Sequence, residues 1–145
     1  MIPTVLFSIY ALMSSHLYAG DDKPFEYSKL PEKAKTFIST HFSNYNVALT
    51  KSGETVFEKE YEVIIANGDE VEFDSKGNWK EVDCQYSAVP TAIIPKKILD
   101  YIEINFPDQY VIKIERDTRK YEVELDNKIE IEFNAKFEVS DIDFD

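Results

Sequence analysis

Two segments of the chain carry apolar residues at helical spacing. In each segment the apolar side chains recur every three or four positions, which places them on one face of an α-helix. A proline stands at the start of each segment, Pro31 and Pro95, where a missing N–H costs nothing, and Pro107 ends the second one. We expect both apolar stripes to face a core; their members are Ala34, Phe37, Ile38 and Phe42, and Ile98, Tyr101, Ile102 and Phe106.

Each predicted helix is followed by segments in which apolar and polar residues alternate. This period of two is typical of an antiparallel strand with one buried face. The clearest cases are "YEVEL" (121–125) and "IEIEF" (129–133), joined by a turn at 126–128. Residues 61–65 and 71–73 repeat the pattern around Asn67-Gly68, a strong hairpin signal. Further strands are expected before each pair (47–50, 111–115) and after it (79–86, 137–144).

The sequence itself is repeated. "LPEKAKTFISTHFSNYN" (30–46) matches "IPKKILDYIEINFPDQY" (94–110), and "YEVIIANGDEVEFDSKG" (61–77) matches "YEVELDNKIEIEFNAKF" (121–137). Two matching blocks in the same order predict two tandem repeats, 20–87 and 88–145. The predicted fold class is α+β, with two tandem helix-plus-antiparallel-strand repeats whose helices pack on one face of an extended antiparallel sheet. The other face is left to solvent or to a partner.

The first twenty-two residues, "MIPTVLFSIYALMSSHLYAGDD", contain no charge before Asp21. An apolar run followed by small residues is typical of a secretory signal, with cleavage after Ala19. We therefore predict a signal peptide at 1–19 and a periplasmic or secreted chain with no membrane span after cleavage. A buried N-terminal helix or strand is the alternative. The single cysteine, Cys84, can form no intrachain disulfide.

Charge narrows the range of partners. The chain has 16 Lys and Arg against 28 Asp and Glu, a formal charge of −12. Such a surface repels nucleic acids and anionic membranes, and it suits a cationic protein or peptide. An envelope partner of that kind is expected; the oligomeric state stays open.

No catalytic set is visible, so we predict that the protein is not an enzyme and needs no cofactor. His41 is interpreted as an edge-of-core or surface residue, and it is the one histidine of the mature chain that could activate Cys84. Cys84 lies in phase with Val82 and Tyr86 on the predicted strand, so it is interpreted as a buried, inert thiol. The C-terminal Asp141, Asp143 and Asp145 alternate, but the glycine turn and closing glutamate of a calcium loop are missing. We predict no specific metal site, and keep acidic cation (calcium) binding in the envelope as the alternative function.

The run "GNWKEVDCQYSAVPTAIIPKKILDYIEINFP" (77–107), followed by "YEVEL" and "IEIEF", resembles the PepSY-like family of secreted Bacteroidetes proteins, which is also described as β-lactamase-inhibitor-like (BLIP-like). The resemblance implies a tandem α+β repeat in the cell envelope and an inhibitor-like or binding role, without a catalytic motif. The chain departs from the pattern where Ser43 stands opposite Pro107, and where Phe137 and Val139 replace Gly77 and Trp79.

The candidate site is the polar face of the sheet. Strand alternation places the polar residues opposite the helices, where they form either a merely soluble surface or an acidic platform for a basic protein or peptide. Lys80, Lys113, Arg116 and Arg119 are expected to interleave. Aromatic anchors would carry much of the binding energy, although Trp79 could equally belong to the core. The predicted site residues are Glu70, Glu72, Trp79, Tyr86, Glu122, Glu124, Glu130 and Glu132.

Overall fold

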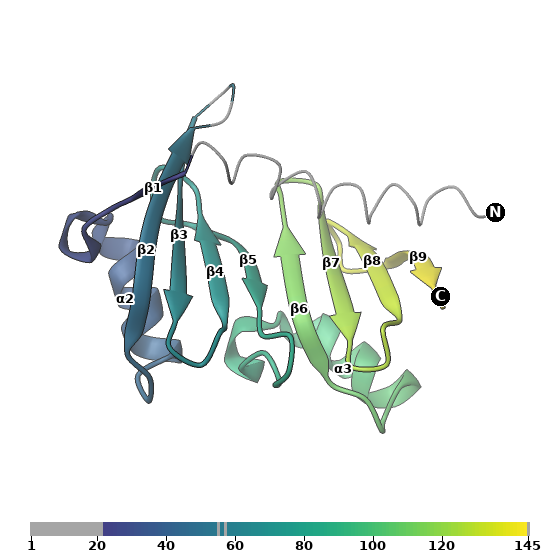
Figure 1. Cartoon of the computed structure of the whole chain (residues 1–145). Helices are drawn as coiled ribbons and strands as arrows, with labels where there is room; N and C mark the ends of the chain where they lie inside the picture. Colours follow the sequence, from purple (N-terminus) through teal and green to yellow (C-terminus); the bar gives the residue numbers. More distant parts are fainter. Residues whose placement is uncertain (1–21, 55, 57, 145) are drawn as a thin grey trace. The chain divides into compact units, whose positions relative to one another are not determined.

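The computed structural model describes residues 22–54, 56 and 58–144 (Figure 1). The predicted signal peptide and its cleavage site lie outside these residues. The described residues divide into two compact units, and the division falls between Val82 and Asp83.

The first unit consists of a helix and an antiparallel sheet. Its strands follow one another in the order β1-β2-β3-β4-β5, and the pairs from β1 to β4 are antiparallel. The elements are β1 (Lys23–Pro24), the 3₁₀ turn η2 (Tyr27–Lys29), α2 (Glu32–His41), β2 (Val47–Glu54), β3 (Lys59–Ile65), β4 (Glu70–Phe73) and β5 (Trp79–Asp83).

The second unit also has one helix and an antiparallel sheet. Its strands follow in the order β6-β7-β8-β9, and each pair is antiparallel. The elements are the 3₁₀ turn η3 (Thr91–Ile93), α3 (Lys96–Asn105), β6 (Val111–Arg116), β7 (Lys120–Leu125), β8 (Glu130–Asn134) and β9 (Val139–Asp143). Pro31 and Pro95 occupy the N-cap positions of α2 and α3.

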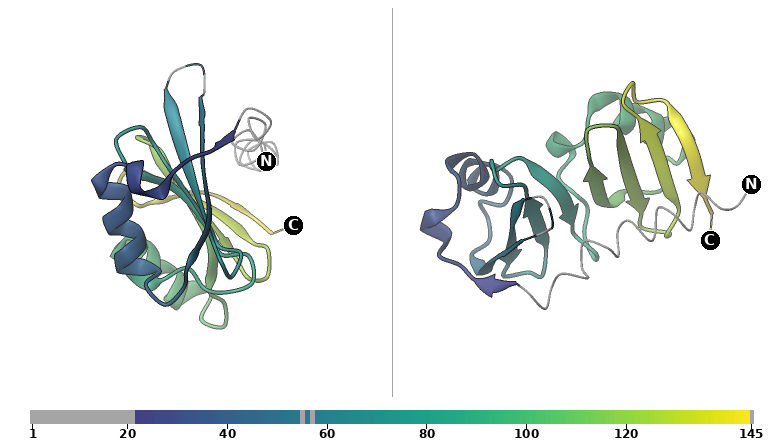
Figure 2. Two further views of the ribbon diagram at one scale, coloured as in Figure 1. Left: turned by 60° about the vertical axis from the view of Figure 1, so that its left-hand side comes forward. Right: turned by 90° about the horizontal axis from the view of Figure 1, so that it is seen from above.

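In each unit the helix covers one face of the sheet, as Figures 1 and 2 show. The ring of Phe37 on α2 meets the ring of Phe73 edge to face, with centroids 5.7 Å apart. Tyr101 on α3 meets Phe133 in the same way at 5.6 Å. Such T-shaped contacts favour aromatic packing beyond the area they bury. The predicted α+β class and antiparallel sheet are therefore confirmed.

Two predicted strands are shorter than expected, because a turn replaces the last residues of one and the first residues of the other. The strand predicted at 79–86 ends at Asp83, whose carboxylate accepts the Gln85 N–H at 3.1 Å, and Gln85 has a φ of 39°. An aspartate that bonds the backbone two residues on favours a turn over an extended chain. The strand predicted at 137–144 begins at Val139, because Phe137 lies in the preceding turn.

The turn before β9 explains one departure from the repeat. Gly77 has a φ of 89°, and Phe137 keeps a φ of 66° at the matching position. In both turns a side-chain oxygen, of Asp74 or Asn134, accepts backbone N–H groups from two and four residues on. The Phe137 ring packs on Tyr121 at 5.4 Å, a contact that offsets the cost of its backbone conformation.

Candidate functional site

The outward sheet face of the first unit, opposite α2, carries charged residues in register. Lys51 on β2 stands opposite Glu62 on β3, which stands opposite Glu72 on β4. The Lys51 ammonium lies 3.5 Å from the Glu62 carboxylate. Lys80 on β5 bonds Glu60, the next outward residue along β3. Two glutamates, Glu62 and Glu72, thus face each other directly across adjacent strands.

Glu72 is the most perturbed group on this face. Desolvation by burial, followed by the charges of Glu81, Glu62 and Glu60, raises the pKa of Glu72 to about 9, and only Lys80 opposes the shift. A carboxyl with such a pKa carries a proton at neutral pH. Protonation removes the repulsion that two ionised glutamates across adjacent strands would cause.

The outward face of the second unit holds two longer charged rows, each running across four strands. One row is Lys113, Glu124, Glu130 and Asp143, and the other is Glu115, Glu122, Glu132 and Asp141. Neighbouring strands lie about 4.8 Å apart, so successive carboxylates in a row are close neighbours. We call these eight residues the acidic rows.

Three lysines lie within 4 Å of carboxylates in or beside the acidic rows. The Lys120 ammonium lies 3.7 Å from Glu122 and 3.5 Å from Glu132, so it bridges the two central carboxylates of one row. Lys113, at the end of the other row, lies 3.6 Å from the carboxylate of Asp83, where the second unit begins. Lys128, which is largely exposed, lies 3.6 Å from Glu124. These lysines therefore offset part of the negative charge of the acidic rows.

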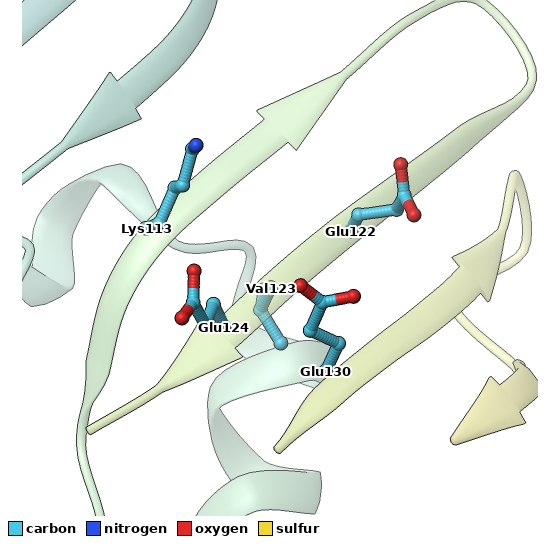
Figure 3. Close-up of a pocket in the computed structure, with 5 residues that line it drawn as sticks. All are labelled: Lys113, Glu122, Val123, Glu124 and Glu130. Carbon is cyan, nitrogen blue, oxygen red and sulfur yellow. The ribbon is translucent and has the colours of Figure 1, made fainter. Parts of the chain in front are cut away.

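A pocket lies among the acidic rows (Figure 3). Lys113 from β6, Glu122, Val123 and Glu124 from β7 and Glu130 from β8 line it. Burial, followed by the charges of Glu124, Glu122 and Asp143, raises the pKa of Glu130 to about 7, against the opposing effect of Lys113. The Oε1 atom of Glu130 is buried and has no hydrogen-bond partner. Glu130 thus titrates close to neutral pH.

Six of the eight predicted site residues lie on these outward faces, and the two aromatic residues do not. Glu70 and Glu72 lie on β4, and Glu122, Glu124, Glu130 and Glu132 lie on β7 and β8. Trp79 packs beneath α2, with its ring centroid 6.2 Å from that of Phe37 and only 8% of its surface exposed. It belongs to the core, the alternative that the sequence left open.

Tyr86 was expected in phase with Cys84 on a strand, and that expectation is wrong. Tyr86 is 91% exposed, because the strand ends at Asp83 and the chain turns. Cys84 is buried as expected. The sequence missed Lys51 and Lys120 as partners of the acidic faces. Lys120 stands where the first repeat has Glu60, and this exchange of charge was the available signal.

Two other features bear on catalysis and metal binding: the position of His41 and the spacing of the acidic side chains. His41 ends α2 and packs on the Phe37 ring at 4.6 Å, and partial burial lowers its pKa. Among residues 22–54, 56 and 58–144, no group of three or more His, Cys, Asp and Glu side chains is placed to hold a metal ion. Within the same ranges no helix is long and apolar enough to cross a membrane.

The fold and the site define an α+β protein with a helix on one sheet face and carboxylate rows on the other. A family model described as "Putative beta-lactamase-inhibitor-like, PepSY-like" matches residues 59–141. The chain belongs to this PepSY-like family, which confirms the resemblance found in the sequence. A comparison with curated proteins finds no match.

Solved structures of periplasmic Bacteroides proteins are similar to this chain. A "putative calcium-regulated periplasmic protein" from Bacteroides thetaiotaomicron is 51% identical and has a TM-score of 0.83; the match covers 86% of this chain and 98% of that protein. A "putative periplasmic protein" of the DUF2874 family from Bacteroides vulgatus is also 51% identical, with a TM-score of 0.82 over 85% and 97% of the two chains. A second Bacteroides vulgatus protein, "of unknown function", is 35% identical with a TM-score of 0.81, over 84% and 98%.

Proposed function

We propose that the protein is a non-enzymatic binding module of the periplasm, which uses an outward acidic sheet face to hold a cationic segment of an envelope protein or peptide. An inhibitor-like action would follow if that segment belongs to an enzyme. Family membership and the periplasmic relatives support the location and the type of protein. The acidic rows support the chemistry of the partner.

One observation carries this proposal: like charges stand directly opposite each other on adjacent strands. Glu122 faces Glu132, and Glu124 faces Glu130. Like charges in this position destabilise a sheet by tenths of a kcal/mol up to about 1 kcal/mol per pair. Lys120 relieves part of the repulsion between Glu122 and Glu132; a cationic ligand would relieve more of it on binding, and an anionic ligand would increase it. The face therefore favours ammonium and guanidinium groups over other ligand chemistry.

We also infer that the two units are copies of one scaffold of the β-lactamase-inhibitor-like type. Each has a helix that begins after a proline and ends before a four-strand run, and each places an edge-to-face aromatic pair between helix and sheet. The charged residues differ between the copies, with Glu60 in one and Lys120 in the other. The copies would therefore not bind the same ligand equally.

Calorimetric titration with a flexible peptide of lysine and glycine tests the proposal. The variant Glu122→Gln/Glu132→Gln should bind it about five- to tenfold more weakly than the unmodified protein, as loss of two charge contacts predicts. The control Glu103→Gln/Asp108→Asn removes the same charge from exposed positions outside the sheet face and should bind as tightly as the unmodified protein. Equal loss in both variants would mean that net charge alone attracts the peptide.

Calcium binding is the second candidate function. The description of the Bacteroides thetaiotaomicron relative as calcium-regulated supports it, whereas the described residues contain no cluster that could hold the ion. Calorimetry with calcium chloride decides between the two functions. Saturable heat that disappears in Glu124→Gln/Glu130→Gln would favour the cation-binding function, and its absence at millimolar calcium would eliminate it.

A further inference from the structure

The last strand of the second unit, β9, has an open edge. β9 pairs with β8 through the register Glu130–Asp143, Ile131–Ile142 and Glu132–Asp141. It is the final strand in the sheet order, and in the described part of the chain no strand pairs with its other side. Figure 1 and the right view of Figure 2 show β9 at the border of its unit. Such an edge presents main-chain N–H and C=O groups to any chain that can extend beside it.

The first unit protects its outer strand differently. There β1, only two residues long, covers part of β2 and contains Pro24, which cannot donate a main-chain hydrogen bond. β9 has five residues and no proline. A bulge near Phe133 and the carboxylates of the strand are its only protective features in the described residues.

Charge decides which chain can use this edge. Asp141 and Asp143 stand opposite Glu132 and Glu130, so the outward side of β9 is acidic at every paired outward position. A second copy of β9 laid alongside would place aspartates next to aspartates, which is unfavourable. Asp143 is only 8% exposed, whereas Asp141 is half-buried, so a lysine or arginine on an added strand would meet Asp141 most directly. The remaining side chains of that strand would lie on the helix side with Ile142 and near Phe144, which is 68% exposed.

We propose that the β9 edge binds an extended, cationic segment of a partner protein, which adds to the sheet as a further strand. Main-chain hydrogen bonds along β9 would provide the affinity and register, and Asp141, with the charge of Asp143 beside it, would favour lysine or arginine on the outward side of the added strand. This mode of strand addition combines sequence-independent backbone pairing with side-chain specificity. The proposal concerns the edge and does not require a ligand on the acidic face.

The experiment uses a short peptide in which lysine and valine alternate. Its controls are two methylated versions of the same peptide, one N-methylated at the odd-numbered residues and the other at the even-numbered residues. N-methylation keeps the charges but removes the main-chain N–H groups that pair on one side of the strand. We expect at least one methylated peptide to bind about tenfold more weakly, and the unmethylated peptide to protect β9 amides from hydrogen exchange. Asp141→Asn/Asp143→Asn should also bind about tenfold more weakly, while Glu103→Gln/Asp108→Asn should not.

Three results would overturn the inference. If both methylated peptides bound as tightly as the unmethylated peptide, attraction by charge alone would explain the binding, which still satisfies the proposed function but removes the strand addition. Exchange protection at strands other than β9 would place the peptide elsewhere. A concentration-dependent dimer of the free protein that itself protects β9 amides would make a second copy the occupant of the edge. Because exchange is read on the unmodified protein, misfolding of an aspartate variant leaves the test intact.

Discussion

Replacing Thr50 by valine should stabilise the first unit. Thr50 on β2 stands opposite Val63, is only 4% exposed, and its hydroxyl is buried without a hydrogen-bond partner. A buried polar group without a partner costs about 1–3 kcal/mol relative to water. Valine keeps the branched shape of the side chain and substitutes a methyl group for the hydroxyl. The repeat offers a precedent, because Ile114 occupies the matching position and is fully buried.

The expected gain follows from that desolvation cost. Thr50→Val should raise the free energy of unfolding by about 1–2 kcal/mol, since the hydroxyl no longer loses its water without compensation. For a unit of this size, each kcal/mol raises the midpoint of thermal unfolding by about 4–8 °C. Denaturant unfolding followed by circular dichroism measures the first quantity, and calorimetry measures the second.

The matched control is Thr118→Val, the same substitution at an exposed position between β6 and β7. It should change the free energy of unfolding by less than about 0.5 kcal/mol. If Thr50→Val leaves stability unchanged or lowers it while the control behaves as expected, then the Thr50 hydroxyl has a partner, such as a bound water. The assignment of an uncompensated polar group in this core would then be wrong.

Three further predictions concern backbone strain, protonation and charge pairing. Gly77→Ala should destabilise the first unit by about 1–3 kcal/mol in denaturant unfolding, because its φ is 89° and an added Cβ would lie 2.9 Å from Pro31. Gly68→Ala should cost less, because its φ is 98° but no atom lies within 4 Å of the added Cβ. The pKa of Glu72 is raised from 4.5 to about 9. Between these pH values the folded state holds a proton that the unfolded state lacks, so the free energy of unfolding falls as pH rises. The free energy of unfolding of Glu72→Gln should therefore exceed that of the unmodified protein by an amount that grows across this range and then levels off. Lys120→Met should destabilise the second unit by about 1 kcal/mol, because it leaves two facing glutamates without their cation, whereas Lys128→Met, at an exposed pair, should cost less.

The sequence was sufficient to predict most elements, because their patterns are local. The stripe around Phe37 and the alternation in 121–133 depend only on the periods of helix and strand. The strand ends could not be read in this way. Whether the chain continues past Asp83 depends on a side-chain bond to a backbone N–H, and Phe137 tolerates its φ because Tyr121 lies beside it.

The candidate site was predicted less completely than the fold. Alternation placed the glutamates on the outward face, but it could not tell that Trp79 points toward α2. It also could not give the register between strands, which determines that Glu122 faces Glu132 and that Lys120 reaches both. Burial of Glu72 and Glu130, and hence their raised pKa values, depends on neighbours from other strands and has no local sequence signature.

The two acidic faces differ in how much negative charge remains for a partner. On the first unit Lys51 and Lys80 engage Glu62 and Glu60, and Glu72 holds a proton at neutral pH, so little charge is left uncompensated. On the second unit one row consists of four carboxylates, and Lys120 lies between its central pair. A cationic ligand gains more where repulsion is unrelieved. The second unit is therefore where a charge-reversing or charge-removing change should affect binding most, and its open β9 edge lies beside those same rows.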